Sequence, residues 1–454
     1  MEGSATRRVP SWTYQHDYYA LALTGTGMAV VTDAVKGKGL YATRPFAADS
    51  TVHEETALCC SQNMDDFNEG VRVCPLCLRS LETPRTQVAR NTRRKRAALA
   101  LPHPELHMPV EPVPCLWREQ GCTECFCSVR CRESALQLFH WVCCTGRMAA
   151  PQRTAHAAFM RYDWVQNGVD YSDTAMLGLR IAAQTVCAHR LRHVPIEEAF
   201  EPYAQLIRSP VSSFYFTYLL MEDIPCDGAD SAAVAAHAAA FEASRHDPLS
   251  VPAVKAAYAP GTRDKDAFCA ASVSLLHDVL DMSPTERDFL HARRWSELMG
   301  AVLLNGQERA PPSPYELHRE LVSCLPDGAA AMAAFEATAH PIGSGGGMAP
   351  GELSRSSRGQ GIYGVGCLFN HSCDPNVIVQ YSSANDETLS VVALRDVAVG
   401  EELTISYIDT SLPVAVRQQQ LQEHYLFECG CSRCVQERSG LPACRAGAAS
   451  AGAS

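Results

Sequence analysis

The sequence Asn370-His371-Ser372-Cys373-Asp374-Pro375-Asn376 is the most informative motif of this chain, and two later motifs complete the signal. Residues 400–407 read GEELTISY, in which ELTISY at 402–407 is typical of a β-strand that ends at a tyrosine. Residues 429–434 read CGCSRC and offer three thiols to a metal that prefers four soft ligands. Each motif alone is weak evidence, but the three in this order form a specific combination.

The overall composition is that of an acidic globular protein. The chain has 454 residues, and 39 Lys and Arg against 50 Asp and Glu give a formal net charge of -11. A chain of this length is expected to hold about two or three domains. Because contact with nucleic acid phosphates needs a basic face, we expect no direct nucleic acid partner. The start of the chain has no apolar core, and no run of about 18 apolar residues occurs, so we expect neither a signal peptide nor a membrane span.

Cysteine is unusually frequent, at 21 residues, and its positions are clustered. Seven cysteines fall within residues 115–144 and three within 429–434. Without a secretory signal, such clusters favour zinc thiolate sites over disulfides. Short ligand pairs occur at 74/77, at 127/131 and at 140/144, where the first member is a histidine. A further pair is either Cys115 with Cys122 or Cys122 with Cys125; we prefer the first, because Cys125 leaves little room to turn before Cys127.

The order of the segments predicts a mixture of helix and strand. Residues 28–59 read as short strands around a turn at 37–39, and residues 150–300 carry Ala, Leu and Arg at helical spacing. Strands return at 377–381 and 389–394 as a hairpin, and a short helix is expected at about 413–425. The stretch 84–114 is rich in proline and charge and has basic residues at 93–96. This run is either a patch for nuclear import or an anionic partner, or a solvated loop; we favour the loop.

The three motifs together resemble the SET-domain protein-lysine methyltransferases. Gly37-Lys38-Gly39-Leu40 resembles the opening cofactor loop of that family, and the cysteine block resembles a MYND zinc finger placed inside the SET domain. This arrangement is similar to the SET-and-MYND family. Leu304-Asn305-Gly306-Gln307 and the extended cysteine block look most like the fifth member of that family, in which, as we expect here, no C-terminal helical domain follows.

The resemblance implies an α+β fold, in which a β-rich split SET domain carries an inserted MYND-type zinc finger, a helical insert and a post-SET zinc segment. The implied division of the chain is the SET N-terminal part at 25–73, the zinc finger at 74–144, the helical insert at 145–300, the catalytic C-terminal part at 301–410, the post-SET segment at 411–436 and a disordered tail at 437–454.

Three zinc ions are implied, each with four ligands. By resemblance, ligand pairs in the finger alternate between two ions. The first ion takes Cys74, Cys77, Cys127 and Cys131, and the second takes Cys115, Cys122, His140 and Cys144. The third takes Cys373, Cys429, Cys431 and Cys434, and this closed thiolate site is structural.

The cofactor implied by the resemblance is S-adenosylmethionine. The residues expected to contact it are Lys38, Gly39, Asn305, Asn370, His371, Tyr407 and Phe427, of which Phe427 stacks on the adenine. Tyr407 matches the active-site tyrosine of the family and Tyr425 lines the lysine channel, so both are predicted catalytic residues. An aromatic channel favours a lysine stem and a methylated ammonium through cation–π attraction.

The function expected is therefore protein-lysine N-methyl transfer to an exposed lysine of a histone or another basic protein. The alternative is a catalytically inert zinc-finger scaffold that recruits protein partners; the presence of Tyr407 and Asn370 argues against it. We further expect proline-rich peptides as partners of the finger, a monomeric protein, and a location in the nucleus, the cytoplasm or both.

Overall fold

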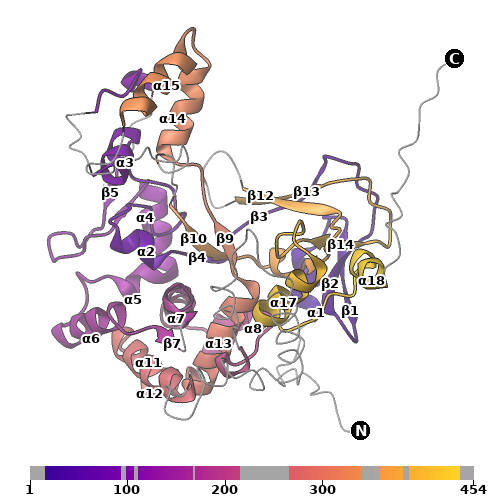
Figure 1. Cartoon of the computed structure of the whole chain (residues 1–454). Helices are drawn as coiled ribbons and strands as arrows, with labels where there is room; N and C mark the ends of the chain where they lie inside the picture. Colours follow the sequence, from indigo (N-terminus) through magenta and orange to yellow (C-terminus); the bar gives the residue numbers. More distant parts are fainter. Residues whose placement is uncertain are drawn as a thin grey trace, which may run out of the picture.

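The structure is a computed structural model that describes residues 16–93, 99–106, 111–166, 169–214, 265–339, 353, 357–381 and 388–439. Figure 1 shows a strand-rich half on the right, a group of helices at the lower left and a small helical lobe at the top. The mixture of helix and strand predicted from the sequence is confirmed. In the described part of the chain, none of the helices combines the length and apolar character that crossing a bilayer requires.

One four-stranded sheet joins the beginning of the chain to its C-terminal motifs. Its strands, in spatial order, are β1 (Met28–Asp33), β2 (Gly37–Ala42), β14 (Glu402–Ile405) and β11 (Asn370–His371). β14 pairs antiparallel with β2 and parallel with β11, so that Asn370 lies opposite Thr404. The motifs at 370–376 and 400–407 are therefore adjacent strands of one sheet.

Two three-stranded sheets and two short ribbons make up the other sheets found among the described residues. The second sheet is formed by β12 (Val377–Tyr381), β13 (Thr388–Ala393) and β3 (Thr51–Thr56). The third is formed by β4 (Cys59–Gln62), β10 (Gly359–Ile362) and β9 (Gln307–Arg309). The ribbons are β5 (Val113–Pro114) with β6 (Cys125–Phe126) and β7 (Val165–Gln166) with β8 (Val169–Asp170). Antiparallel pairing of β12 with β13 confirms the predicted hairpin.

The turn predicted at 37–39 is wrong, because Gly37-Lys38-Gly39 opens strand β2. The Asp33 carboxylate accepts the backbone N–H groups of Val35 and Lys36, both at 2.7 Å, and so forms the turn three residues earlier. Gly37 then enters the strand with a φ of 78°, a conformation that glycine adopts readily. The strand expected to run to Tyr407 ends at Ile405, two residues before the tyrosine.

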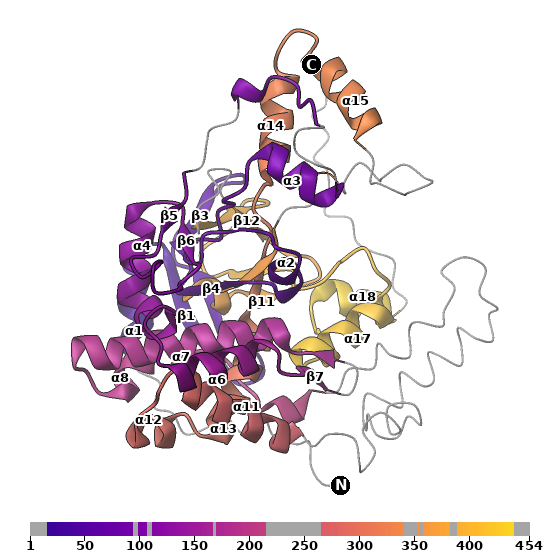
Figure 2. The ribbon, with the colours of Figure 1, turned by 90° about the vertical axis from the view of Figure 1, so that its left-hand side faces the viewer.

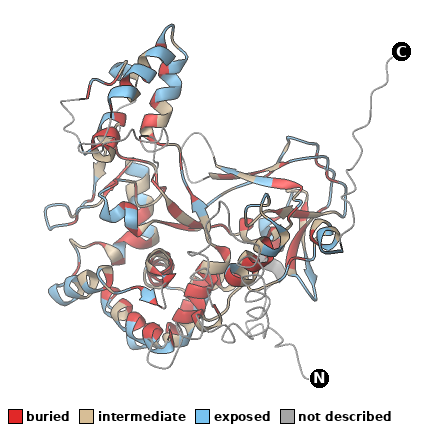
Figure 3. Cartoon of the chain, viewed as in Figure 1, coloured by how far each residue is buried: buried red, intermediate tan, exposed pale blue. Residues whose placement is uncertain are grey.

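The described part of residues 150–300 is helical, as the sequence predicts. Its helices are α6 (Ala150–Met160), α7 (Ser172–Arg192), α8 (Ile196–Ala204), η4 (Val211–Ser213), α11 (Lys265–Val279), α12 (Pro284–Phe289) and α13 (Ala292–Asn305). Figure 2 shows α7 running across the molecule with α11, α12 and α13 below it. α7 and α13 are buried along much of their length, as the red segments in Figure 3 show.

The described part of the stretch 84–114 is not a solvated loop, so the prediction is wrong for residues 84–93, 99–106 and 111–114. It contains α3 (Pro84–Asn91) and η2 (Pro104–Leu106), and α3 packs against α14 (Pro314–Ser323), which is followed by α15 (Gly328–Thr338). The buried residues Val88, Leu99, Tyr315 and Phe335 share one apolar cluster there. This helical lobe, residues 84–93 and 99–106 with 314–338, stands apart at the top of Figures 1 and 2. Of the basic run at 93–96, residues 94–96 lie outside the described residues.

The other helices of the described residues lie in the SET-like parts of the chain, in the finger and in the C-terminal segment. They are α1 (His16–Ala22), α2 (Met64–Asn68), α4 (Val129–Ala135), the π-helical η3 (Leu136–His140), α5 (Trp141–Cys143), η7 (Gly366–Leu368), α17 (Val414–Tyr425) and α18 (Ser432–Ser439). α17 confirms the helix predicted at about 413–425. Residues 437–439 of the predicted tail continue α18, and its other residues lie outside the described part. The six-part division of the chain stays a prediction.

Candidate active site and zinc sites

Two groups of four ligand atoms lie in the zinc finger. In each group all four atoms lie within 4.8 Å of one another; the groups are Cys74, Cys77, Cys127 and Cys131, and Cys115, Cys122, His140 and Cys144. Cys127 Sγ is 3.6 Å from Cys77 Sγ and 3.4 Å from Cys131 Sγ. Four sulfurs around one zinc at about 2.3 Å would be about 3.8 Å apart, so the groups have the size of tetrahedral sites. The described cysteines form no disulfide.

Cys125 is not part of either group, which resolves the alternative left open by the sequence. Its sulfur accepts a hydrogen bond from Arg118 Nη1 at 3.6 Å, and its thiol donates to the Thr123 carbonyl at 3.8 Å. Cys115 Sγ lies 3.2 Å from His140 Nε2 and 3.7 Å from Cys144 Sγ. Cys115, as preferred, therefore completes the second group.

Local structure explains how the finger ligands converge. The Ser128 side chain caps α4 by accepting the Cys131 backbone N–H at 3.1 Å, which fixes the helix that carries Cys131. The next turn, η3, is π-helical and ends at His140. A π-helical turn re-aims the side chains that follow it, and such turns are frequent at functional sites.

A third group of four sulfurs joins the 370–376 motif to the C-terminal segment. Its members are Cys373, Cys429, Cys431 and Cys434, again within 4.8 Å of one another. Cys373 Sγ is 3.5 Å from Cys434 Sγ and 4.0 Å from Cys429 Sγ. The guanidinium of Arg417 is 1% exposed and donates to Cys373 Sγ at 3.3 Å and to Glu437 at 2.7 Å. A buried cation beside thiolates balances part of their negative charge.

Tyr407 lies at the centre of the candidate active site. Its hydroxyl donates to the Phe369 carbonyl at 2.6 Å, and its backbone N–H donates to His371 Nδ1 at 3.0 Å. The ring of Tyr425 lies 4.7 Å from the Tyr407 ring, and the Tyr425 hydroxyl reaches the Tyr407 carbonyl at 3.4 Å. Burial raises the pKa of Tyr407 well above its ordinary value, so the phenol stays protonated near neutral pH.

A cavity of about 410 Å³ opens beside Tyr407. Its wall includes Tyr425, Asn305, Tyr381 and Glu308. The Tyr381 hydroxyl donates to the Glu308 carbonyl, and burial raises the pKa of Tyr381 to about 12. This volume lies in the range of small-molecule sites, which are mostly apolar with a few placed polar groups.

The turn at 363–368 forms one side of this cavity and is held by two side chains. The Glu55 carboxylate accepts the backbone N–H groups of Val365 and Gly366. The Gln307 amide donates to the Gly366 carbonyl at 3.2 Å. The cavity wall is thus fixed by residues from β3 and β9, far from it in sequence.

Asn370 and Gly39 meet between β2 and β11. Asn370 Nδ2 donates to the Lys38 carbonyl at 3.1 Å and to Glu402 Oε1 at 2.9 Å. A Cβ on residue 39 would lie 2.7 Å from that nitrogen, so only glycine permits the approach. The Lys38 side chain points elsewhere: its Nζ donates to the Gln205 carbonyl at 2.6 Å, and burial lowers its pKa to about 8.

The predicted cofactor residues fall into two sets around Tyr407. Asn305 and Tyr407 line the cavity, whereas Lys38, Gly39, Asn370, His371 and Phe427 are not among its described lining residues. The ring of His371 lies 5.4 Å from Tyr407 and 6.2 Å from Phe427. The Asn305 amide donates to the carbonyls of Ile207 and Ala301. Their roles toward the cofactor stay predictions.

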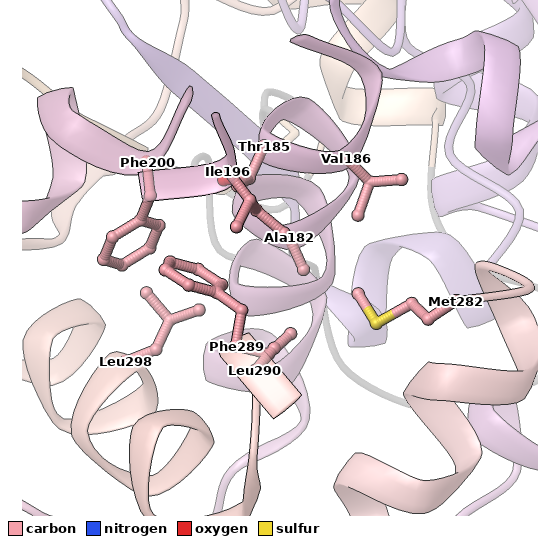
Figure 4. Close-up of a pocket in the computed structure, with 9 residues that line it drawn as sticks. All are labelled: Ala182, Thr185, Val186, Ile196, Phe200, Met282, Phe289, Leu290 and Leu298. Carbon is pink, nitrogen blue, oxygen red and sulfur yellow. The ribbon is translucent and has the colours of Figure 1, made fainter. Parts of the chain in front are cut away.

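A second hollow lies between α7, α8, α12 and α13. Its nine labelled residues in Figure 4 are apolar except for Thr185. The free volume is about 10 Å³, about the space of one water molecule. It is a packing gap in the helical core.

The comparisons with known proteins identify the family. The sequence model of the SET domain matches residues 37–408, which is most of the chain. The chain belongs to the SET-domain family. It is similar to the protein-lysine N-trimethyltransferase SMYD5 of Danio rerio, with 24% identity over 434 residues that cover 89% of this chain and 85% of the relative.

Two matches cover a shorter stretch of the chain but have a higher sequence identity. The histone-lysine N-methyltransferase SMYD3 of Homo sapiens is 46% identical over 76 residues, 17% of each chain. A SET and MYND domain-containing protein of Dictyostelium discoideum is 50% identical over 88 residues, 19% of this chain and 16% of that protein. Together these matches confirm the SET-and-MYND resemblance, most like SMYD5, and the α+β fold of this SET-domain protein.

The residues of this SET-domain protein fit the cofactors of its family. The enzyme class is protein-lysine N-methyltransferase, which uses S-adenosylmethionine. The cavity beside Tyr407 and the glycine-dependent contact at Asn370 suit a bound small molecule. The three four-ligand groups suit three zinc ions.

Four residues of the SET-domain protein were not predicted from its sequence. Glu402 binds Asn370, Arg417 binds Cys373, and Tyr381 and Glu308 line the cavity. Glu402 sits inside the 400–407 motif, but the motif by itself does not indicate which residue it binds. The sequence carries no signal for the others, because their partners are distant in the chain.

Proposed function

We propose that this protein methylates a lysine in an exposed, flexible segment of a histone or another basic protein. The observation that carries this proposal is the cavity of about 410 Å³, whose wall includes the three tyrosines Tyr381, Tyr407 and Tyr425. A net charge of -11 favours encounter with a basic substrate.

The chemistry asks the site to hold an amine in its neutral form. S-adenosylmethionine, when bound, supplies an activated methyl group on a positive sulfur. An unperturbed lysine has a pKa of about 10.4, and burial of the amine away from water disfavours its charged form. Because Tyr407 donates its own proton to Phe369, its oxygen keeps lone pairs that can accept an N–H of the amine.

By family resemblance, the groups that would hold the cofactor are Lys38 and Gly39 of β2, Asn305 at the end of α13, Asn370 and His371 of β11, and Tyr407 with Phe427. Positioning of the reacting groups alone can contribute about 7–11 kcal/mol to lowering the barrier.

Glu308 is proposed to attract the substrate before lysine enters. Among the described residues that line the cavity it is the one with an ionisable carboxyl group, and it is exposed. A carboxylate at the mouth of an aromatic channel favours approach of an ammonium group. This placement supports a basic rather than an acidic peptide.

A recruiting role for the zinc finger is the second candidate function. The Arg147 guanidinium lies 3.4 Å from the centre of the Trp141 ring and 4.7 Å from that of Trp117, and the neighbouring Leu116 is 57% exposed. Aromatic surfaces of this kind bind proline-rich segments. We therefore propose proline-rich peptides as partners of the finger. A monomer, and a location in the nucleus, the cytoplasm or both, complete the proposal.

Methyl transfer can be tested directly with labelled cofactor. The purified full chain is incubated with tritiated S-adenosylmethionine and either histones, another basic protein or an acidic protein of similar size. We expect label in the basic proteins and none in the acidic one. Absence of transfer to every protein, with no cofactor binding in calorimetry, would leave only the scaffold role. Transfer to the acidic protein alone would contradict the proposed substrate.

A further inference from the structure

We infer that His371 is a positioning residue that couples the third zinc site to Tyr407, with its proton on Nε2 directed at the Cys373 sulfur. The inference rests on the proposed function for its effect on turnover. It does not rest on that function for the hydrogen bonds themselves. Nothing in the family match assigns this connection.

The tautomer of His371 follows from its two neighbours. The backbone N–H of Tyr407 points at His371 Nδ1 over 3.0 Å. A backbone N–H can only donate, so Nδ1 must be the bare, accepting nitrogen. In a neutral ring the proton then sits on Nε2, which lies 3.2 Å from Cys373 Sγ. His371 therefore accepts from Tyr407 on one side and donates to Cys373 on the other.

The state of the Cys373 sulfur follows in turn. Arg417 Nε, which can only donate, lies 3.3 Å from the same atom. Two donors, His371 Nε2 and Arg417 Nε, thus converge on Cys373 Sγ. A sulfur approached by two donors accepts from both, and this arrangement suits the thiolate that a zinc ion would bind. Donors to a ligand atom orient it and tune its hold on the metal.

One short segment of the chain serves both sites. The Phe369 carbonyl accepts the Tyr407 phenol, His371 Nδ1 accepts the Tyr407 N–H, and Cys373 joins the sulfurs of the third metal group. Tyr407 is held at its backbone and its hydroxyl by residues within four positions of a zinc ligand. Loss of order at the metal therefore reaches Tyr407 through His371.

Two substitutions separate the two hydrogen bonds. An asparagine places its oxygen near the position of Nδ1, so His371→Asn keeps an acceptor for Tyr407 and loses the donor to sulfur. A glutamine places its amide nitrogen near the position of Nε2, so His371→Gln keeps the donor and loses the acceptor. Each variant thus loses one of the two hydrogen bonds, and the two replacement side chains are similar in size.

Zinc release and turnover are then measured on the holoprotein. Zinc release to a chromogenic chelator is followed at fixed pH, and the phase belonging to the third site is the one missing in Cys373→Ser. We expect this phase to be about 10-fold faster in His371→Asn and within about two-fold of wild type in His371→Gln. For turnover we expect the larger fall in kcat in His371→Gln, with the KM for peptide little changed.

The tautomer itself is read by nitrogen NMR on protein labelled with ¹⁵N-histidine. The ring signal missing from His371→Asn is expected to show protonated Nε2 and bare Nδ1, and to shift when the third zinc is removed. A protonated Nδ1, or equal effects of the two substitutions on both zinc release and kcat, would overturn the inference. If the wild type transfers no methyl group, the proposed function fails while zinc release and the NMR signal still decide the coupling. If either variant does not fold, the wild-type spectrum alone decides it.

Discussion

The phenol of Tyr407 donates its hydrogen bond to the carbonyl oxygen of Phe369, at 2.6 Å. This bond leaves the oxygen lone pairs directed away from the acceptor, beside a cavity whose wall also holds Tyr425. Because burial raises the Tyr407 pKa, the side chain stays a neutral phenol at neutral and moderately alkaline pH.

Replacement of Tyr407 by phenylalanine should separate binding from turnover. The ring and its packing remain, so cofactor affinity in calorimetry should stay close to that of wild type. The hydroxyl that orients the amine is lost, and misplacement of reacting groups costs about 100-fold in rate. We expect kcat to fall by about that factor. For comparison, Tyr425→Phe removes a 3.4 Å contact with the Tyr407 carbonyl, and its kcat should fall less than that of Tyr407→Phe. An unchanged kcat in Tyr407→Phe would contradict the role given to Tyr407.

Removal of a ligand from the third zinc site should lower both metal content and cofactor affinity. Cys429→Ser leaves three sulfurs around the site, and we expect elemental analysis to find two zinc ions per chain where the wild type has three, one for each ligand group. Cofactor affinity should fall, because His371 and Phe427 lie next to this site. Cys324→Ser is the matched control, since Cys324 is exposed and belongs to none of the three groups. Full zinc content in Cys429→Ser would rule out the ligand set.

The sequence predicts those parts of the site in which chemistry and spacing coincide. Zinc needs particular ligands at short spacing, so Cys74 and Cys77 or Cys431 and Cys434 could be paired from the sequence alone. The role of Tyr407 as the active-site tyrosine could be predicted because the motif around it is specific. Glu402 was not, since its partners Asn370 and Lys36 are 32 and 366 positions away. A side chain with no chemical requirement of its own gives no signal of such a distant contact.

The helical lobe escaped prediction for a related reason. Its stretch 84–106 is rich in proline and charge, which favours a loop when read locally. The few apolar residues, such as Val88 and Leu101, form a core only with α14 and α15, more than 200 residues further along. Tertiary contacts therefore overrode local composition. The strand at Gly37 was missed similarly, because the Asp33 side chain moved the turn to its N-terminal side.

Truncation of Val88 tests whether the lobe is a folded part of the protein. Val88 is fully buried against residues of α14 and α15. Val88→Ala should lower the free energy of unfolding by about 2 kcal/mol, from lost burial and the cavity left behind. Urea denaturation followed by circular dichroism measures this change. Val129→Ala, at a position that is 48% exposed, should change stability by less than about 0.5 kcal/mol. No change in the Val88 variant would restore the solvated-loop interpretation.

The ion pair between Arg190 of α7 and Glu286 of α12 should give a stability that depends on pH. Burial by itself raises the pKa of Glu286, but two bonds from Arg190, at 2.8 and 2.7 Å, and one from the Ser283 backbone outweigh it and lower the pKa. A carboxyl group whose pKa is lower in the folded state than in the unfolded state stabilises the fold at pH values above the unfolded pKa, which is near 4.5. This stabilisation is lost as the pH falls through the lower pKa of the folded state.

Glu286→Gln should therefore be less stable than wild type at pH 7, by roughly 2 kcal/mol, since Glu286 is buried but Arg190 is partly exposed. The difference between the two unfolding free energies should shrink below about pH 4. The exposed pair Arg287–Asp278 provides the control, and Asp278→Asn should cost at most about 1 kcal/mol. A difference that stays constant from pH 7 to pH 3 would show that the charge of Glu286 is not the cause.

Substitution of Glu308 tests how the substrate reaches the cavity. Glu308→Gln keeps the backbone carbonyl that binds the Tyr381 hydroxyl and removes only the negative charge. We expect the KM for a basic peptide to rise about five-fold at low salt, with kcat unchanged, because an exposed charge pair is worth at most about 1 kcal/mol. The effect should disappear at about 1 M salt, where charges are screened beyond about 3 Å. Glu320→Gln removes an exposed carboxylate from α14 that does not line the cavity, and it should leave KM unchanged. A KM that rises equally in both variants would assign the effect to net charge, and one that persists at high salt would assign it to cavity shape; either result would remove Glu308 from substrate attraction.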